Sequence, residues 1–135
     1  MLDKTKFYID GRWAAPIDGT DFPVINPATE DAFATISLGG QKDAEAAIAA
    51  AKTAFPAWSV TRPQTRIGYL EKLLAVYEER SQDMAQAISS EMGAPIDMSL
   101  SDQAGSGRSH LKAFTRALGS FEFQRPLRPG VEGQD

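Results

Sequence analysis

Three stretches with apolar residues at helical spacing, each bounded by glycine or proline, constrain this fold more than any other feature. They cover about residues 41–56, 62–92 and 96–118. In each stretch apolar residues recur every three or four positions, which places them along one side of an α-helix. The chain is therefore predicted to be mostly helical, with three helices.

The ends of the first two helices carry recognisable signals. Asp43 is predicted to cap the first helix, because a carboxylate can accept a hydrogen bond from a free backbone amide, and Pro56 is expected to end that helix. Thr61 is the expected N-cap of the second helix, and Gly93 suits the position just after its end, where a positive φ is common. Residues 81–83 could mark either a kink or a new start.

The apolar stripe and the glycines of these helices predict close packing. The second helix is expected to bury four side chains: Leu70, Leu73, Leu74 and Ile88. In the third helix Gly105 and Gly107 each cost about 1 kcal/mol relative to alanine, so both are expected to lie against a neighbouring element. Gly119 is expected to stop that helix.

A β arm is predicted before the helices, over about residues 7–36. Residues 7–13 read as a hairpin that turns at Asp10-Gly11, a pair that suits a two-residue turn. Residues 33–36 are predicted to form a further short strand. The expected fold is therefore three helices with an N-terminal hairpin arm and short strands.

Two other segments are expected to be extended. Residues 22–25 form a stretch that should end before Pro27, because the residue preceding a proline avoids the α conformation. Phe121 and Phe123 alternate with a glutamate, so a strand that serves oligomerisation is predicted to begin within residues 120–135.

Composition excludes several classes of protein. The 135 residues suit one domain or part of a larger one, and the net charge of −4 argues against a nucleic-acid-binding protein, which usually carries a basic face. With no cysteine, and with His110 as the one histidine, the chain offers no disulfide, no thiol nucleophile and no histidine metal cluster. No apolar run approaches the roughly 20 residues of a membrane span. Met1-Leu2-Asp3-Lys4 leads into no apolar stretch of the kind that a signal peptide contains, so a cytoplasmic protein without a signal peptide is expected.

Four places could carry chemistry, and each has a simpler structural interpretation. Glu91 could be an acid or a base, but residues 91–95 are typical of a helix end followed by a new helix. His110 has no serine, cysteine or acid placed to form a triad with it. Residues 105–107 lack the third glycine of a dinucleotide fingerprint, and residues 39–40 lack the lysine of a phosphate-binding loop. The residues by themselves assign no catalytic and no cofactor-binding position.

Four segments, taken in order, resemble the N-terminal part of aldehyde dehydrogenases. They are Phe7-Tyr8-Ile9-Asp10-Gly11-Arg12-Trp13, Val24-Ile25-Asn26-Pro27-Ala28-Thr29, Ala54-Phe55-Pro56-Ala57-Trp58 and Glu91-Met92-Gly93-Ala94-Pro95. The resemblance covers nearly the whole chain in register. One departure is Glu30, which stands where many members have glycine.

For the parent enzymes the resemblance implies an α/β fold and NAD- or NADP-dependent oxidation of an aldehyde to a carboxylic acid. In that chemistry a cysteine captures the aldehyde, an asparagine helps to hold the oxyanion, and a glutamate activates water. These residues, and most of the cofactor-binding domain, belong to parts of the family fold beyond the segment matched here. No catalytic residue is therefore assigned to this chain, and no cofactor is expected to bind it alone.

The resemblance also implies partners for the helices. In the family they pack against a dinucleotide-binding domain, so apolar surface at Phe55, Trp58, Leu111 and Phe114 is expected to lack cover within this chain. The expected partners are the remainder of the enzyme or other subunits, with a homo-oligomer as the expected assembly. Neither nucleic acid nor a membrane is expected as a partner.

A structural monovalent cation is the one site that the resemblance brings to this segment. In many members backbone carbonyls near the strand before Asn-Pro and a side chain of the third helix hold it. By position these would be Val24 and Ile25, together with Gln103 or Asp102. Carbonyl and amide oxygens suit a hard, weakly held cation.

Three hypotheses follow for the function. The first is the N-terminal portion of an aldehyde dehydrogenase, inactive as a truncated chain. The second is a non-catalytic interaction or oligomerisation module. The third is an unrelated three-helix adaptor with a hairpin arm.

Overall fold

In the computed structural model, which describes residues 1–124, the N-terminal part of the chain is built from short strands. They are β1 (Leu2–Lys4), β2 (Phe7–Ile9), β3 (Arg12–Ala14), β4 (Thr20–Ile25) and β5 (Ala32–Leu38). The strands β2 and β3 form the predicted antiparallel hairpin. Its turn has φ 53° at Asp10 and 72° at Gly11, as a primed two-residue turn requires.

The second sheet contains a strand that the pattern did not predict. Its order is β1-β5-β4, with β1 parallel to β5 and β4 antiparallel to β5. All three side chains of β1 are exposed, so it has no alternating apolar pattern that could have revealed it. The predicted β arm over residues 7–36 therefore begins earlier than expected, at Leu2, and continues to Leu38.

The rest of the described chain is helical, as predicted. It consists of α1 (Gln41–Ser59), α2 (Pro63–Glu79), α3 (Ser81–Met92), α4 (Ile96–Met98), the π-helical segment η1 (Ser99–Ala104) and α5 (Gly105–Ser120). The stretch expected over residues 62–92 is two helices, because a new helix starts at Ser81. The stretch expected over residues 96–118 contains the π-helical turn η1, and no sequence pattern indicated it.

Several expected helix ends are wrong. Pro56 lies inside α1, because a proline removes only its own amide bond and one further turn can follow it. The N-cap of α2 is Arg62, since the hydroxyl of Thr61 donates instead to the carbonyl of Ala57 at the end of α1. Gly119 does not stop α5, which continues to Ser120.

The helix end predicted at Gly93 is confirmed, whereas the strand predicted to begin within residues 120–135 is not seen in the described residues. Gly93 has φ 72° and caps α3 in the left-handed conformation, as predicted. No strand includes Phe121 or Phe123, and the remainder of the predicted extended segment, residues 125–135, lies outside the described residues.

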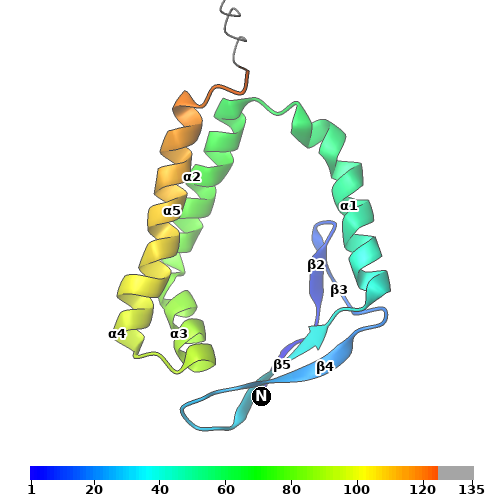
Figure 1. Cartoon of the computed structure of the whole chain (residues 1–135), viewed down its shortest axis with the longest axis vertical. Coiled ribbons are helices and arrows are strands. Elements are labelled where there is room, and N and C mark those ends of the chain that lie inside the picture. The colour runs from blue at the N-terminus through cyan, green and yellow to red at the C-terminus, as the bar shows by residue number, and fades with distance from the viewer. Residues whose placement is uncertain (125–135) are drawn as a thin grey trace, which may run out of the picture.

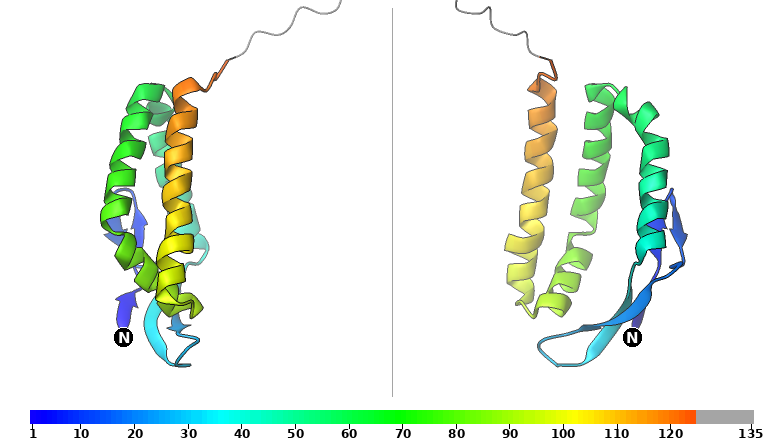
Figure 2. Two further views of the ribbon diagram at one scale, coloured as in Figure 1. Left: turned by 90° about the vertical axis from the view of Figure 1, so that its left-hand side faces the viewer. Right: turned by 45° about the vertical axis from the view of Figure 1, so that its right-hand side comes forward.

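These elements form an open frame (Figure 1). The helices α2 and α5 stand side by side, α1 stands opposite them, and β4 and β5 run along the base. In the right-hand view of Figure 2, α5, α2 and α1 stand in a row, and α1 leads down to the strands at the base. A side chain at Gly93 would lie 2.9 Å from Pro27, so the loop after β4 meets the end of α3 and closes the frame at its base.

The described residues form almost no apolar core. The buried apolar residues of the described chain are three alanines, Ala34, Ala85 and Ala104. The accessible surface is 10778 Å², whereas a folded monomer of this mass is expected to expose about 6900 Å². Among the described residues, no helix is both long and apolar enough to span a membrane.

The predicted buried face of the second helix is only partly correct. Leu73 is 51% exposed, so its predicted burial is wrong in this chain. Leu70, Leu74 and Ile88 are half-buried. The helical stripe predicts which side of the helix is apolar, but burial requires a neighbouring element to cover it.

Candidate functional site

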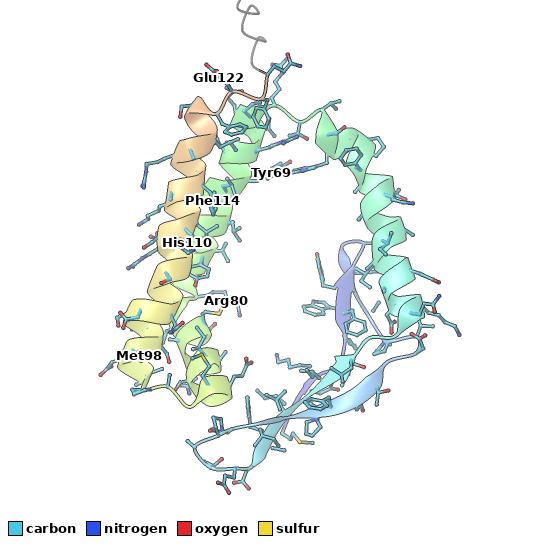
Figure 3. The ribbon with its side chains drawn as sticks, in the orientation of Figure 1. Tyr69, Arg80, Met98, His110, Phe114 and Glu122 are labelled. Carbon is cyan, nitrogen blue, oxygen red and sulfur yellow. The ribbon has the colours of Figure 1, made fainter. Side chains whose placement is uncertain are left out.

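The most distinctive surface is an apolar groove where α1, α2 and α5 approach one another. It has a volume of about 430 Å³ and is lined by Trp58, Arg66, Tyr69, Leu70, Phe114, Ala117, Leu118, Phe121 and Phe123. Tyr69 extends from α2 toward the end of α1 (Figure 3), where its ring lies 6.0 Å from that of Trp58. Three of the side chains predicted to lack cover are exposed: Phe55 (65%), Trp58 (47%) and Phe114 (67%). Leu111, predicted with them, is half-buried.

Among residues 1–124, Arg66 is the one charged residue that lines this groove, and no sequence signal distinguished it. Its Nη2 donates to the carbonyl oxygens of Trp58 at 2.9 Å and Ser59 at 3.2 Å, in the last turn of α1. The Trp58 carbonyl also accepts a hydrogen bond from the amide of Thr61 at 3.0 Å. Its guanidinium carbon lies 5.2 Å from the centre of the Trp58 ring and 6.0 Å from that of Phe123. This groove, which we name the Arg66 groove, is therefore a largely aromatic surface around one guanidinium group.

Carboxylates hold the opposite end of α1. Asp43 is 5% exposed, and its carboxylate accepts hydrogen bonds from the amide of Ile17 at 2.7 Å and of Gly40 at 3.2 Å. Asp18 accepts another bond from the amide of Lys42 at 3.2 Å. The hydrogen bond from Ile17 is the main reason that the pKa of Asp43 is lowered from its ordinary value.

The predicted cap at Asp43 therefore differs in detail from the structure. The N-cap residue is Gly40, and Asp43 reaches back to it from the first turn. These bonds occupy the helix N-terminus with carboxylates, which leaves it unsuited to a phosphate group. The structural interpretation of residues 39–40 as a plain turn is favoured.

The two glycines of α5 have different surroundings. A side chain at Gly107 would collide with the ring of Tyr77, whose hydroxyl donates to the carbonyl of Ala104 at 3.0 Å. A side chain at Gly105 would meet only the carbonyl of Leu100 at 3.7 Å, an ordinary contact. The predicted close approach is thus correct for Gly107 and wrong for Gly105, and both glycines lie inside a helix instead of a nucleotide-binding loop.

The other candidates for chemistry remain isolated. Glu91 is exposed near the end of α3, and His110 is exposed on α5 (Figure 3). Among residues 1–124 no three histidine, cysteine or acidic side chains gather as a metal site. Among the described residues, no partner side chain of the kind that acid–base or nucleophilic catalysis requires is seen beside Glu91 or His110. The described residues likewise present no glycine-rich phosphate loop that would fit a dinucleotide.

The predicted cation site stays a prediction. Val24 and Ile25 form the end of β4, at an irregularity in its pairing with β5. Gln103 is exposed in η1, and the carboxylate of Asp102 accepts a hydrogen bond from the hydroxyl of Ser101 at 3.1 Å. The backbone carbonyls at the end of β4 and the side chains of η1 offer oxygen atoms, which are the ligands that a hard cation prefers.

Comparisons with known proteins agree on one family. The sequence model of the aldehyde dehydrogenase family matches residues 13–130. A 3-succinoylsemialdehyde-pyridine dehydrogenase from a Pseudomonas species is 38% identical over 128 residues, which are 94% of this chain and 27% of the relative. The chain thus spans about a quarter of the length of the curated relatives that it matches.

Solved structures show the same relationship in three dimensions. An aldehyde dehydrogenase from Bartonella henselae superimposes with a TM-score of 0.92 and 52% identity, over 98% of this chain and 28% of that one. An aldehyde dehydrogenase from Pseudomonas syringae, crystallised with NAD⁺ and octanal, superimposes with a TM-score of 0.88 and 37% identity, over 91% of this chain and 25% of that one.

Proposed function

This chain belongs to the aldehyde dehydrogenase family, and from that membership we propose that it forms the N-terminal segment of an NAD- or NADP-dependent aldehyde dehydrogenase. The parent enzyme would oxidise an aldehyde to a carboxylic acid through a cysteine thioester. Membership also removes the hypothesis of an unrelated three-helix adaptor.

The large apolar side chains that stay exposed among the described residues are the observation that carries this proposal. Side chains that normally form a core are exposed on several elements, among them Ile48, Phe55 and Leu73, at 57%, 65% and 51%. Exposed apolar surface on this scale marks an interface. The relatives are about four times as long as the matched segment, so their folds contain material that could cover it.

The proposed role of the chain is structural, and it is inactive by itself. It has no cysteine to capture an aldehyde, and the described residues do not fit NAD or NADP. Its own contribution would be to hold the N-terminal helices of the fold in place. The proposed partners are the rest of the enzyme and further subunits of a homo-oligomer in the cytoplasm.

Reconstitution tests the proposal. The chain would be co-expressed with the part of the Bartonella henselae enzyme that follows the matched segment, and aldehyde-dependent formation of NADH or NADPH would be followed by absorbance. We expect activity from the pair and none from either piece alone. Activity from the chain alone, or no gain when the chain is added, would contradict the proposal.

A second function, a non-catalytic interaction module, is favoured by the Arg66 groove alone, since an apolar groove suits a partner helix or loop. The same experiment separates the two functions. A stable complex that never gains dehydrogenase activity would favour the module.

A further inference from the structure

The dipeptide Asp-Gly occurs twice in the sequence, and the two copies have different surroundings. Asp10-Gly11 forms the turn of the β2–β3 hairpin, and Asp18-Gly19 lies between β3 and β4. Asp-Gly is prone to spontaneous cyclisation, because glycine has no side chain to hinder the approach of its amide nitrogen to the aspartate side chain. The fold therefore decides which of the two copies can react.

The reaction needs only the two residues and water. The amide nitrogen of the glycine attacks the carboxyl carbon of the protonated aspartate side chain. A C–N bond forms, and the carboxyl hydroxyl leaves with the amide proton as water, which gives a cyclic imide (a succinimide). Water then opens the ring at either carbonyl, and the product is aspartate again or isoaspartate, in which the main chain runs through the former side chain. Nothing is oxidised or reduced.

The first copy is free to cyclise. Asp10 is exposed, and among residues 1–124 its carboxylate has neither a hydrogen bond nor an ion pair. A side chain built at Gly11 would meet nothing within 4 Å, so the turn has open space on that side. The attacking amide of Gly11 lies outside the β2–β3 ladder, whose last pair is Ile9 with Arg12. Rotation within the turn alone can therefore bring the carboxyl carbon to the nitrogen.

The second copy is held in place. The Asp18 carboxylate accepts a hydrogen bond from the amide of Lys42 at 3.2 Å, which ties it to the start of α1. A side chain at Gly40 would collide with the same carboxylate, so α1 also limits its rotation. At Gly19 an added Cβ would lie 2.5 Å from the hydroxyl oxygen of Ser37, so that backbone is closely packed. Cyclisation there requires the hydrogen bond and this packing to be broken first.

We propose that Asp10-Gly11 is a site of spontaneous succinimide formation and isoaspartate accumulation in the folded chain, and that the fold protects Asp18-Gly19 from the same reaction. Isoaspartate at residue 10 adds one carbon to the main chain of the turn. Because loop length controls hairpin pairing, the change disturbs the pair Tyr8 and Trp13, whose ring centres are 5.3 Å apart. The modified turn would also be a substrate for the class of methyltransferase that esterifies isoaspartate.

Incubation of the whole chain at neutral pH tests the proposal, once folded in buffer and once unfolded in guanidinium chloride. Mass spectrometry of proteolytic peptides with electron-transfer fragmentation would distinguish isoaspartate from aspartate. The incubation continues until the unfolded chain carries isoaspartate at both positions, which should react there at comparable rates. In the folded chain we expect isoaspartate at residue 10, with residue 18 at least about tenfold slower, because its hydrogen bond to a charged group must open first.

Two conservative variants assign the product to its residue, with an isoaspartate methyltransferase and labelled S-adenosylmethionine as the probe. Asp10→Glu should abolish labelling of the folded chain, because the longer side chain forms the corresponding ring far more slowly. Asp18→Glu is the matched control and should leave the labelling unchanged.

Three results in the folded chain would overturn the inference: equal accumulation at both positions, faster reaction at residue 18, or no isoaspartate at residue 10. Labelling that persists in Asp10→Glu would overturn it as well. The proposed function stands or falls separately, because it concerns association with the remainder of the enzyme.

Discussion

The helix pair α2–α5 and the single helix α1 are stabilised in different ways. The pair is held by contacts within the chain: Tyr77 over Gly107, and an ion pair between Glu78 and Lys112 at 2.8 Å. The helix α1 is held mainly at its ends, by Asp43 at one and by Arg66 at the other. Its apolar side chains remain exposed between those ends.

This difference separates helices that are packed against each other within the described chain from a helix whose apolar side chains stay exposed. Under the proposed function, that exposed surface is where a partner binds. Changes within the helix pair should alter the stability of the chain alone. Changes on the exposed side of α1 should alter association with a partner and leave stability nearly unchanged. The following predictions test that division, beginning with the largest expected effect.

Gly107→Ala should destabilise the chain by about 1–3 kcal/mol, because the added methyl group would collide with the ring of Tyr77. Gly68→Ala is the matched control on α2, where a side chain meets nothing within 4 Å. It should stabilise the chain by about 0.5–1 kcal/mol through helix propensity. Urea unfolding would measure both, and a loss in both variants would contradict the packing assigned to the pair.

Asp43→Asn should destabilise the chain less than Gly107→Ala, by weakening the bonds from Ile17 and Gly40. Because the folded-state pKa of Asp43 is lowered, its carboxylate stabilises the fold fully above the unfolded pKa of about 3.9. That contribution is lost as the pH falls through the folded-state pKa. The free energy of unfolding, measured between neutral pH and about pH 2, should therefore fall less steeply with decreasing pH in Asp43→Asn than in the wild-type chain.

Glu78→Gln is the comparison for this pH dependence, since the pKa of Glu78 is also lowered, chiefly by its hydrogen bond from Lys112. Glu78→Gln should change the pH dependence of the free energy of unfolding less than Asp43→Asn does, because Glu78 is more exposed than Asp43. An acid profile unchanged by Asp43→Asn would show that this carboxylate does not anchor α1.

Glu30→Gly should stabilise the chain by about 0.5–1 kcal/mol. Glu30 has φ 62°, a left-handed conformation that costs residues with a side chain about 1 kcal/mol and glycine almost nothing. Thermal unfolding would measure the gain. Glu30→Ala keeps the strained backbone and should gain nothing, so an equal gain there would assign the effect to the carboxylate instead.

Phe55→Ser should have the smallest effect on stability, within about 0.5 kcal/mol, because Phe55 is 65% exposed on α1. The same change should reduce self-association of the chain, which sedimentation at several concentrations would detect. A large loss of stability would mean that α1 is packed within this chain after all.

Local signals in the sequence predicted much of the fold. The apolar stripes indicated the helices, Asp10-Gly11 indicated the hairpin turn, and Gly93 indicated a helix end. Each of these depends on backbone conformation over a few residues, which neighbouring residue types control. The strand β1 and the π-helical turn η1 escaped prediction, because partners distant in the sequence stabilise both.

The sequence by itself determined which surfaces are apolar, where most helices lie and, through its motifs, the family. Only the tertiary structure decided which of those surfaces are covered. It also assigned Asp43 to the joint between α1 and the arm, and it surrounded Arg66 with aromatic rings. The physical reason is that burial and hydrogen-bond pairing depend on which segments meet in space, and residue types along the chain do not specify those meetings.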